Sequence, residues 1–271
     1  MTDTTVVPTV HERHDIAREL SRRWDAQQSG FIRHRHERFT TMARVVAGRV
    51  DGVPAPRILD LAGGTGSLAA AVLEDVPHAT VVVADKDPVL LAIAADLAAT
   101  DERLVIAELD LTDPGWRTHP AIASAPFDAV VSSTALHWLR PEALTRVYFE
   151  LAGVVRPGGL VLNGDHFSYD ALTEPAMRAL ADADDRAVQA TTFDSGVDTW
   201  DAWWAAAESV PHYATAVDRR RDVWGTDLHT PPPKVTADFH LQAMRSAGFA
   251  ETGTVWRYLD DHVLYGVRDS Y

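Results

Sequence analysis

The residues with the clearest chemical potential lie in one glycine-rich segment, RILDLAGGTGSLAAAV, residues 57–72. A strand-like run ends in Asp60, a turn containing Gly63, Gly64 and Gly66 follows, and an Ala/Leu-rich helical pattern begins at once. Glycines let a ligand approach the backbone closely, and the ligand then lies beside the first turn of the helix. The segment predicts a small-molecule site, although a tight strand-to-helix connection without a ligand has the same pattern.

A second carboxylate narrows the kind of ligand. Asp85 ends the run TVVVAD, 25 residues beyond Asp60, and a carboxylate at that point can accept both hydroxyls of a ribose. A dinucleotide and an adenosylated cofactor both contain such a ribose. The dinucleotide pattern G-x-G-x-x-G would place its third glycine at Ala69. Asp60 would repel a pyrophosphate and attract an ammonium group, which favours S-adenosylmethionine over NAD(P).

Two histidines are candidates for proton transfer. His137 lies in SSTALHWL, after a strand-like run, and His166 follows the next strand-like run in NGDHF. Histidine titrates near neutral pH, so either could serve as general base for a phenol, an alcohol or an amine. Each could equally be a structural residue with its hydrogen bonds satisfied within the protein. We retain both as catalytic candidates.

The other candidates would position the acceptor. A carboxylate acceptor needs no base, only donors that orient it, and the indole N–H of Trp138 and the amides of Gln27 and Gln28 are such donors. Trp203 and Trp204 could line an apolar pocket, or could attach their segment to the core. The run Arg219–Arg221 could attract an acidic substrate or lie on a solvated helix face. His11, His14, His34 and His36 lack acidic or Cys partners at metal-binding spacing, and we predict no metal.

The elements that must position these residues have the rhythm of a doubly wound α/β protein. Short branched apolar runs (RILDL, TVVVAD, RLVIAEL, DAVVSS, GLVLNGD) alternate mostly with Ala/Leu-rich helical stretches, which is typical of parallel strands buried on both faces. Two helical patterns broken at Gly30, the second beginning with Phe31, precede them. Two alternating runs joined by Asp260 and Asp261 follow and predict a closing antiparallel hairpin.

We therefore predict a Rossmann-like fold with a mainly parallel, seven-stranded sheet. A helical cap occupies 1–50, the cofactor-binding core 51–167, and a helical lid 168–240 with a turn at Pro231–Pro233. A final helix and the hairpin at 241–271 complete the core.

Composition excludes several classes of protein. The 271 residues carry 25 Lys and Arg against 39 Asp and Glu, a net charge of −14, which argues against nucleic acid and anionic membranes as partners. There is no Cys, so disulfides, thiolate nucleophiles and zinc–thiolate sites are excluded. No apolar run approaches the ~20 residues of a membrane span, and the N-terminus lacks a signal-peptide pattern. We expect a soluble, cytoplasmic protein, either monomer or homodimer.

Five motifs resemble, in their order along the chain, those of class I S-adenosylmethionine-dependent methyltransferases. They are LDLAGGTGSLA, VVVADKDPVLLAIA, AELDLTD, FDAVVSSTALHWL and RPGGLVLNG. The LHW segment is similar to that of trans-aconitate-type and plant carboxyl O-methyltransferases. The resemblance implies that Asp60 and Gly64 face the methionine part, that Asp85 binds the ribose, and that Asp110 and Leu111 flank the adenine. Where the family usually has glycine, this chain has Ala62. The remaining expected cofactor residues are Ala62, Gly63, Gly66, Lys86 and Ser132.

We therefore expect methyl transfer to an oxygen atom of a small molecule, first a carboxylate and next a phenol or hydroxyl. The resemblance maps Trp138 onto the tryptophan that helps hold the carboxylate in the plant group. N- or C-methylation of a natural-product intermediate is the alternative. A protein that keeps the cofactor for a structural, non-methylating role is a third hypothesis, because function resides in the site rather than in the fold.

Overall fold

The structure is a computed structural model that describes residues 8–225 and 235–270. Its centre is one seven-stranded sheet with the strand order β3-β2-β1-β4-β5-β7-β6. The strands are β1 (Arg57–Leu61), β2 (Thr80–Asp85), β3 (Leu104–Glu108), β4 (Phe127–Ser133), β5 (Val155–His166), β6 (Phe249–Tyr258) and β7 (Asp261–Arg268).

The direction of the strands confirms the predicted fold class. Strands β1 to β5 pair in parallel, whereas β7 is antiparallel to both β5 and β6. The strand order reverses between β1 and β4, which are neighbours in the sheet. Ligands of open α/β sheets bind outside the carboxyl ends of the strands at such a reversal. The glycine-rich turn after β1 and the LHW segment after β4 therefore open at the same crevice.

Helices cover both faces of the sheet, because successive residues of each buried strand point to opposite sides. Ile58 packs with apolar side chains of α2 (Arg35–Arg49) and α3 (Ser67–Asp75). Its neighbour Leu59 packs on the other face, with α6 (Pro141–Val154) and α10 (Ala237–Ser246). The short α5 (Pro120–Ala123) and the 3-10 turns η1 (Trp116–Thr118) and η2 (Leu136–Trp138) also belong to this face.

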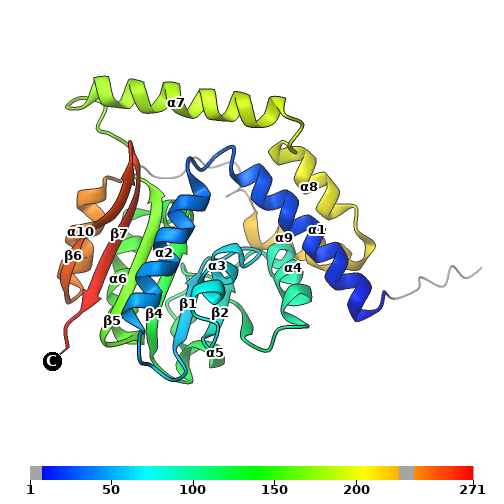
Figure 1. Ribbon diagram of the computed structural model, residues 1–271, viewed down its shortest axis with the longest axis horizontal. Helices are drawn as coiled ribbons and strands as arrows, with labels where there is room; N and C mark the ends of the chain where they lie inside the picture. The colour runs from blue at the N-terminus through cyan, green and yellow to red at the C-terminus, as the bar shows by residue number, and fades with distance from the viewer. Residues whose placement is uncertain (1–7, 226–234, 271) are drawn as a thin grey trace, which may run out of the picture.

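A third apolar cluster joins the N-terminal cap to the insertion. Helix α1 (Val10–Gln28) packs against α4 (Pro88–Ala98) and against α8 (Trp200–Glu208). The insertion between β5 and β6 also contains α7 (Pro175–Asp194), η3 (Pro211–Tyr213) and α9 (Ala214–Trp224). Figure 1 shows α7 arching above the end of the sheet at which the parallel strands finish, beyond the rest of the molecule.

Several expected boundaries need correction. Phe31 was expected to begin the second helix, but that helix starts at Arg35 and Phe31 lies in the connection. Asp261 was expected in a turn, but it is the first residue of β7 and is fully buried. Helix α10 begins within the expected lid, yet it packs on the core. The predicted turn at Pro231–Pro233 lies outside the described residues.

No helix in the described part of the chain is both long and apolar enough to cross a membrane. Within the same residues, no group of three His, Asp or Glu side chains could hold a metal ion.

Candidate active site

The glycine-rich turn has the backbone that a ligand cradle requires. Gly64 and Gly66 have φ values of 56° and 85°, in the left-handed region that favours glycine. Gly63 has no such φ but is confined by Asp60, because a Cβ built on Gly63 would lie 2.6 Å from the carboxyl carbon of that side chain. Ala62, where the related family usually has glycine, also adopts a left-handed φ of 56°. This departure therefore falls at a strained position.

Asp60 has the character of a receptor for a cationic group. Its carboxylate is fully buried and accepts one hydrogen bond, from the backbone N–H of Ala69 at 3.0 Å. The other oxygen, Oδ1, has no hydrogen-bond partner among the described residues. Burial raises the pKa of Asp60 to about 7, despite the hydrogen bond from Ala69. An ammonium group placed there would satisfy the free oxygen and favour the ionised form.

Asp85 lies beside the same turn, at the end of β2. It accepts hydrogen bonds of 2.8 Å from the backbone N–H groups of Gly64 and Asp87. Burial raises its pKa to about 6, partly offset by these hydrogen bonds. Ser132, at the end of β4, has a buried hydroxyl without a partner in the part of the chain that the structure describes. The turn thus offers carboxylates and a hydroxyl that still have hydrogen-bonding capacity.

The expected adenine end is more open. Asp110 accepts hydrogen bonds from the backbone N–H and the hydroxyl of Thr112, and its Oδ2 lies 4.0 Å from the Lys86 ammonium. Leu111 beside it is buried. Lys86 lies 4.0 Å from the centre of the Trp224 ring, which the insertion contributes.

These residues fit an S-adenosylmethionine molecule. An unpartnered buried oxygen on Asp60 suits the amino group, and Asp85 is placed for the ribose. The backbone of Gly63 and Gly64 leaves no side chain over the turn. The roles of these residues in cofactor binding stay a prediction.

The two candidate histidines each form a pair with a buried aspartate. His137 Nδ1 lies 2.6 Å from Asp165 Oδ1, and His166 Nδ1 lies 2.6 Å from Asp261 Oδ1. Both aspartates are fully buried, and the two imidazole centroids are 6.2 Å apart. An aspartate at Nδ1 fixes the tautomer and leaves Nε2 free to receive a proton. The sequence pointed to both histidines but missed Asp165 and Asp261.

The two aspartates of these pairs have different charged neighbours. The pKa of Asp165 lies below its usual range: burial alone would raise it, but the charge and hydrogen bond of His137 and the charge of His166 outweigh that effect. Asp261 interacts in addition with Arg33 Nε at 2.8 Å and with Arg38 at 3.6 Å. Arg38 is fully buried, and burial lowers its pKa to about 10.

Arg33 and Arg38 were not anticipated. Arg33 holds the β6–β7 turn through Asp260 and Asp261, and it also donates to the backbone carbonyl of Ala181 in α7. Arg38 donates to the hydroxyls of Ser133 and Thr134. Arg33 lies in the connection before α2 and Arg38 lies within α2. Arginines in loops and on helix surfaces are normally solvent-exposed, so no sequence signal distinguished these two.

Trp138 lies at the open side of the site. Its side chain is 44% exposed, and its ring centroid is 5.4 Å from that of His137 and 6.4 Å from that of Trp224. Trp224 in turn donates its indole N–H to Asp87, which also accepts from Arg220. Trp224 therefore joins the insertion to the loop that carries Asp85. Arg220 is buried in this contact, so the interpretation of Arg219–Arg221 as a wholly solvated face is wrong for Arg220.

The other expected acceptor residues lie in packed surroundings. Trp203 is fully buried and donates its indole N–H to the Leu20 carbonyl of α1, and Trp204 is 7% exposed. These contacts favour the interpretation that they attach the insertion. Gln27 is also fully buried, and its Oε1 accepts from the amide of Gln28. A role of Gln27 and Gln28 in acceptor binding stays a prediction.

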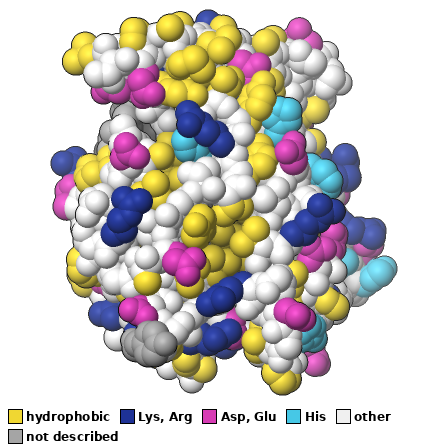
Figure 2. Space-filling model, turned by 60° about the vertical axis from the view of Figure 1, so that its left-hand side comes forward, with side chains coloured by type: hydrophobic (Ala, Val, Ile, Leu, Met, Phe, Trp, Pro, Cys, Tyr) yellow, Lys and Arg dark blue, Asp and Glu magenta, His cyan; other side chains and the backbone are white. Residues whose placement is uncertain are grey.

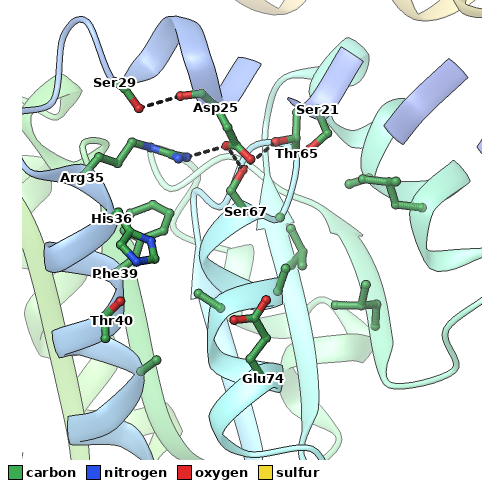
Figure 3. Close-up of a pocket in the computed structure, with 18 of the residues that line it drawn as sticks. Ser21, Asp25, Ser29, Arg35, His36, Phe39, Thr40, Thr65, Ser67 and Glu74 are labelled. Carbon is green, nitrogen blue, oxygen red and sulfur yellow. Dashed lines mark hydrogen bonds and ion pairs between the residues drawn. The ribbon is translucent and has the colours of Figure 1, made fainter. Parts of the chain in front are cut away.

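A cavity of about 630 Å³ lies behind the glycine-rich turn, between α1, α2, α3 and α4. Figure 3 shows Asp25 of α1 at its upper end, where it accepts from Ser67 at 2.6 Å and from Arg35 at 2.8 Å. Neither Asp60 nor Asp85 lines this cavity. The cluster instead ties the helical cap to the first residue of α3.

Comparison with known proteins identifies a domain and a fold. Residues 58–159 match the family described as a methyltransferase domain. A solved O-methyltransferase family protein from Burkholderia thailandensis is 21% identical and aligns over 98% of this chain and 74% of its own, with a TM-score of 0.55. Human N-acetylserotonin methyltransferase, solved with S-adenosylmethionine, is 14% identical over 96% of this chain and 57% of its own, with a TM-score of 0.53.

The CurJ carbon methyltransferase is 13% identical over 86% of this chain and 54% of its own, with a TM-score of 0.54. The chain thus spans little more than half the length of the last two structures. A search of curated proteins found no match. At these identities the structural likeness establishes the fold, and the match over residues 58–159 identifies the domain.

Residues 58–159 match a methyltransferase domain, and the sheet order agrees with the Rossmann-like methyltransferase fold expected from the motifs. The residues of the site fit the expected cofactor, S-adenosylmethionine.

Proposed function

We propose that this enzyme methylates a hydroxyl oxygen of a small organic molecule and that His137 is the general base. The observation that carries the proposal is the His137–Asp165 pair, with a 2.6 Å contact at Nδ1 and a fully buried aspartate. His137 follows β4, the strand that pairs with the strand carrying Asp60. The base is thus adjacent to the expected methionine end of the cofactor site.

The charge of the site supports a hydroxyl over a carboxylate acceptor. Asp165 contacts His137 and Asp261 contacts His166, and the charge of Asp185 in α7 also interacts with that of His166. Arg33 and Arg38 are already engaged with the β6–β7 turn and with β4. A carboxylate acceptor would meet like charges here, whereas a hydroxyl must lose a proton and finds a base.

The chain's residues divide the work of the reaction. When bound, S-adenosylmethionine supplies a methyl group on a sulfonium. Asp60 would hold its amino group, Asp85 its ribose, and Asp110 with Leu111 its adenine. His137 would take the hydroxyl proton on Nε2 while its Nδ1–H donates to Asp165, a contribution of roughly 10²–10⁴-fold in rate. Alignment of the two reactants would supply most of the remaining acceleration.

The experiment that tests this is removal of the base. His137→Ala should lower kcat by roughly 10²–10⁴-fold towards a phenol that the wild type methylates, with unchanged binding of S-adenosylhomocysteine. His212→Ala is the matched control, because His212 also contacts an aspartate, Asp96, at 3.1 Å, but lies in η3. Full activity of the His137→Ala enzyme would overturn the proposal.

One observation favours a carboxylate as second candidate. The indole of Trp138 is half-exposed and donates to no described residue in the structure. Turnover confined to small carboxylic acids, lost in Trp138→Phe but retained in His137→Ala, would select this alternative. Trp138→Phe removes the N–H and keeps an aromatic ring, so it separates donation from packing.

We further propose that the enzyme works in the cytoplasm on a free small molecule, as a monomer or homodimer. Support for a homodimer comes from α7, where Leu172 just before the helix is 90% exposed and Met177 and Leu180 are also exposed. Figure 2 shows hydrophobic side chains on the part of the surface that α7 forms. Molecular mass in solution distinguishes the two states.

A further inference from the structure

The site contains two histidine–aspartate pairs of the same construction, and the proposed reaction uses only one. His137 comes from the turn after β4, and His166 is the last residue of the neighbouring strand β5. In each pair the aspartate occupies Nδ1 at 2.6 Å. The side chains are 19% and 29% exposed, and neither Nε2 has a hydrogen-bond partner within residues 8–225 and 235–270.

The distance between the two imidazole rings limits which ligand could hydrogen-bond to both. With centroids 6.2 Å apart and planes inclined at 62°, the rings do not hydrogen-bond to each other. Two neighbouring oxygen atoms of one bound molecule would bridge them, each oxygen taking one imidazole. A single oxygen would leave one buried histidine–aspartate pair unused.

The groups around His166 favour its protonated form. Burial alone would lower the pKa of His166, but the hydrogen bond and charge of Asp261 and the charge of Asp165 raise it above its ordinary value, against the opposing charge of Arg38. The charge of Asp185 in α7 also interacts with that of His166. His166 is therefore protonated at higher pH than an ordinary histidine, which makes it a hydrogen-bond donor to an oxygen.

An aromatic wall stands beside His137. Trp138 is 5.4 Å from the His137 ring, and Trp224 approaches Trp138 nearly edge-on, at 74° and 6.4 Å. Exposed indole faces at a site mouth suit a flat, apolar ligand.

We propose that the acceptor is an aromatic compound with oxygen atoms on two adjacent ring carbons, such as an ortho-diol or an ortho-hydroxy carbonyl compound. His137 receives the proton of the hydroxyl that is methylated, and His166 donates to the neighbouring oxygen. The ring lies against Trp138. This assignment rests on the proposed hydroxyl methylation and adds the substrate class and the role of His166.

Isomeric diols test the assignment. With wild-type enzyme and S-adenosylmethionine, kcat/KM for 2,3-dihydroxynaphthalene should exceed that for 2,7-dihydroxynaphthalene by about tenfold or more, the effect of one hydrogen bond from a charged donor. His166→Asn keeps an amide near the Nδ1 position and removes the group at Nε2, so the ratio should fall to about one. His166→Gln, with its amide near the Nε2 position, should restore part of the preference.

Controls separate this inference from the proposed function. His212→Asn is the same substitution at a histidine in η3 whose Nε2 contacts Asp96, and it should leave the ratio unchanged. Equal turnover of the two diols, dependent on His137, would overturn the ortho assignment while the proposed function stands. If neither diol is methylated, the proposed function fails for these compounds. Calorimetry with S-adenosylhomocysteine present then decides the assignment, because equal affinity for both isomers overturns it.

Discussion

The two halves of the crevice are built in different ways. The proposed cofactor half comprises a continuous segment, Asp60 to Gly66, and a carboxylate 25 residues beyond Asp60, at Asp85. Its key features are backbone features: left-handed φ values, N–H groups that bind Asp85, and a glycine that leaves room for Asp60. Residues that are close together in the sequence form such a site, so the sequence alone can predict it.

The acceptor half is assembled from remote segments. Arg33 and Arg38 come from the helical cap, His137 and Asp165 from the middle of the chain, and Asp261 from the last strand. Its key features are charged side chains that are buried because they pair with one another. The comparison teaches that local backbone geometry shapes one half of this crevice, whereas pairing between charged side chains from remote segments shapes the other.

The largest expected effect is on stability, in the acceptor half. Asp261→Asn removes the charge that Arg33, Arg38 and His166 share, and should cost about 3–5 kcal/mol of unfolding free energy, because a buried charge network loses a central partner. Denaturant unfolding measures this loss. Binding of S-adenosylhomocysteine to the folded variant should persist, and its disappearance would mean that the two halves are not independent.

A substitution in the cofactor half should lower cofactor affinity and leave the stability of the fold unchanged. Gly63→Ala would place a methyl group 2.6 Å from the Asp60 carboxyl carbon and displace that side chain. Affinity for S-adenosylmethionine should fall by about 100-fold or more, equivalent to about 2.7 kcal/mol, with a fold that remains intact. Calorimetry measures the affinity, and circular dichroism checks the fold.

Gly48→Ala is the matched control for that substitution. A Cβ added to Gly48 in α2 would meet no described atom within 4 Å beyond its own helix. Alanine there should leave binding unchanged and stabilise the helix by roughly 0.5–1 kcal/mol. Equal affinity of the Gly63→Ala and Gly48→Ala proteins would contradict the assigned role of Asp60.

The same contrast explains what the sequence could predict. Local patterns of glycine, branched residues and strand-end carboxylates predicted the seven strands and pointed to Asp60 and Asp85 as candidates. Asp110 was named only through the resemblance to a known family. His137 and His166 were visible as candidates because they follow strands. The aspartates that pair with these histidines could not be predicted from the sequence. Asp261, for example, follows another aspartate in a pattern typical of turns, and its burial depends on Arg33, 228 residues away.

The insertion illustrates the same limit. Its tryptophans predicted an apolar surface, but not which tryptophan would face the site. Trp203 and Trp224 differ only in tertiary context: the first is buried against α1, and the second lies between Lys86 and Trp138. No periodicity in the sequence predicts which of the two tryptophans is buried and which lies at the site.

The pH dependence of binding should report on the cofactor half alone. The pKa of Asp60 in the free protein is about 7, raised by burial, and a bound ammonium group favours its ionised form. Affinity for S-adenosylmethionine should therefore rise with pH up to about 7, by at most about tenfold per pH unit below it, with release of a proton. Calorimetry in buffers of different ionisation enthalpy measures that proton.

Asp60→Asn provides the control for this dependence. It should bind more weakly and lose this contribution to the pH dependence. In the free protein, a raised pKa means that Asp60 favours the folded state at low pH and that this stabilisation is lost as pH rises from about 4 to about 7. The Asn variant without ligand should thus gain Tm at pH 8 more than at pH 5. A pH dependence of binding that survives in the Asn variant would have to come from another group.

The smallest expected effect concerns the one position where the turn departs from the family pattern. Ala62 holds a φ of 56°, a conformation that costs a residue with a Cβ roughly 1–2 kcal/mol. Ala62→Gly would relieve that strain, at a cost of roughly 0.5–1 kcal/mol from the greater freedom of the unfolded chain. The net gain of about 0.5–1 kcal/mol should raise Tm by roughly 1–4 °C. Because the backbone already has the required geometry, affinity for S-adenosylmethionine should change less than threefold. A large gain in affinity would instead mean that Ala62 distorts the cradle, and that even the backbone-encoded half of this site depends on a side chain.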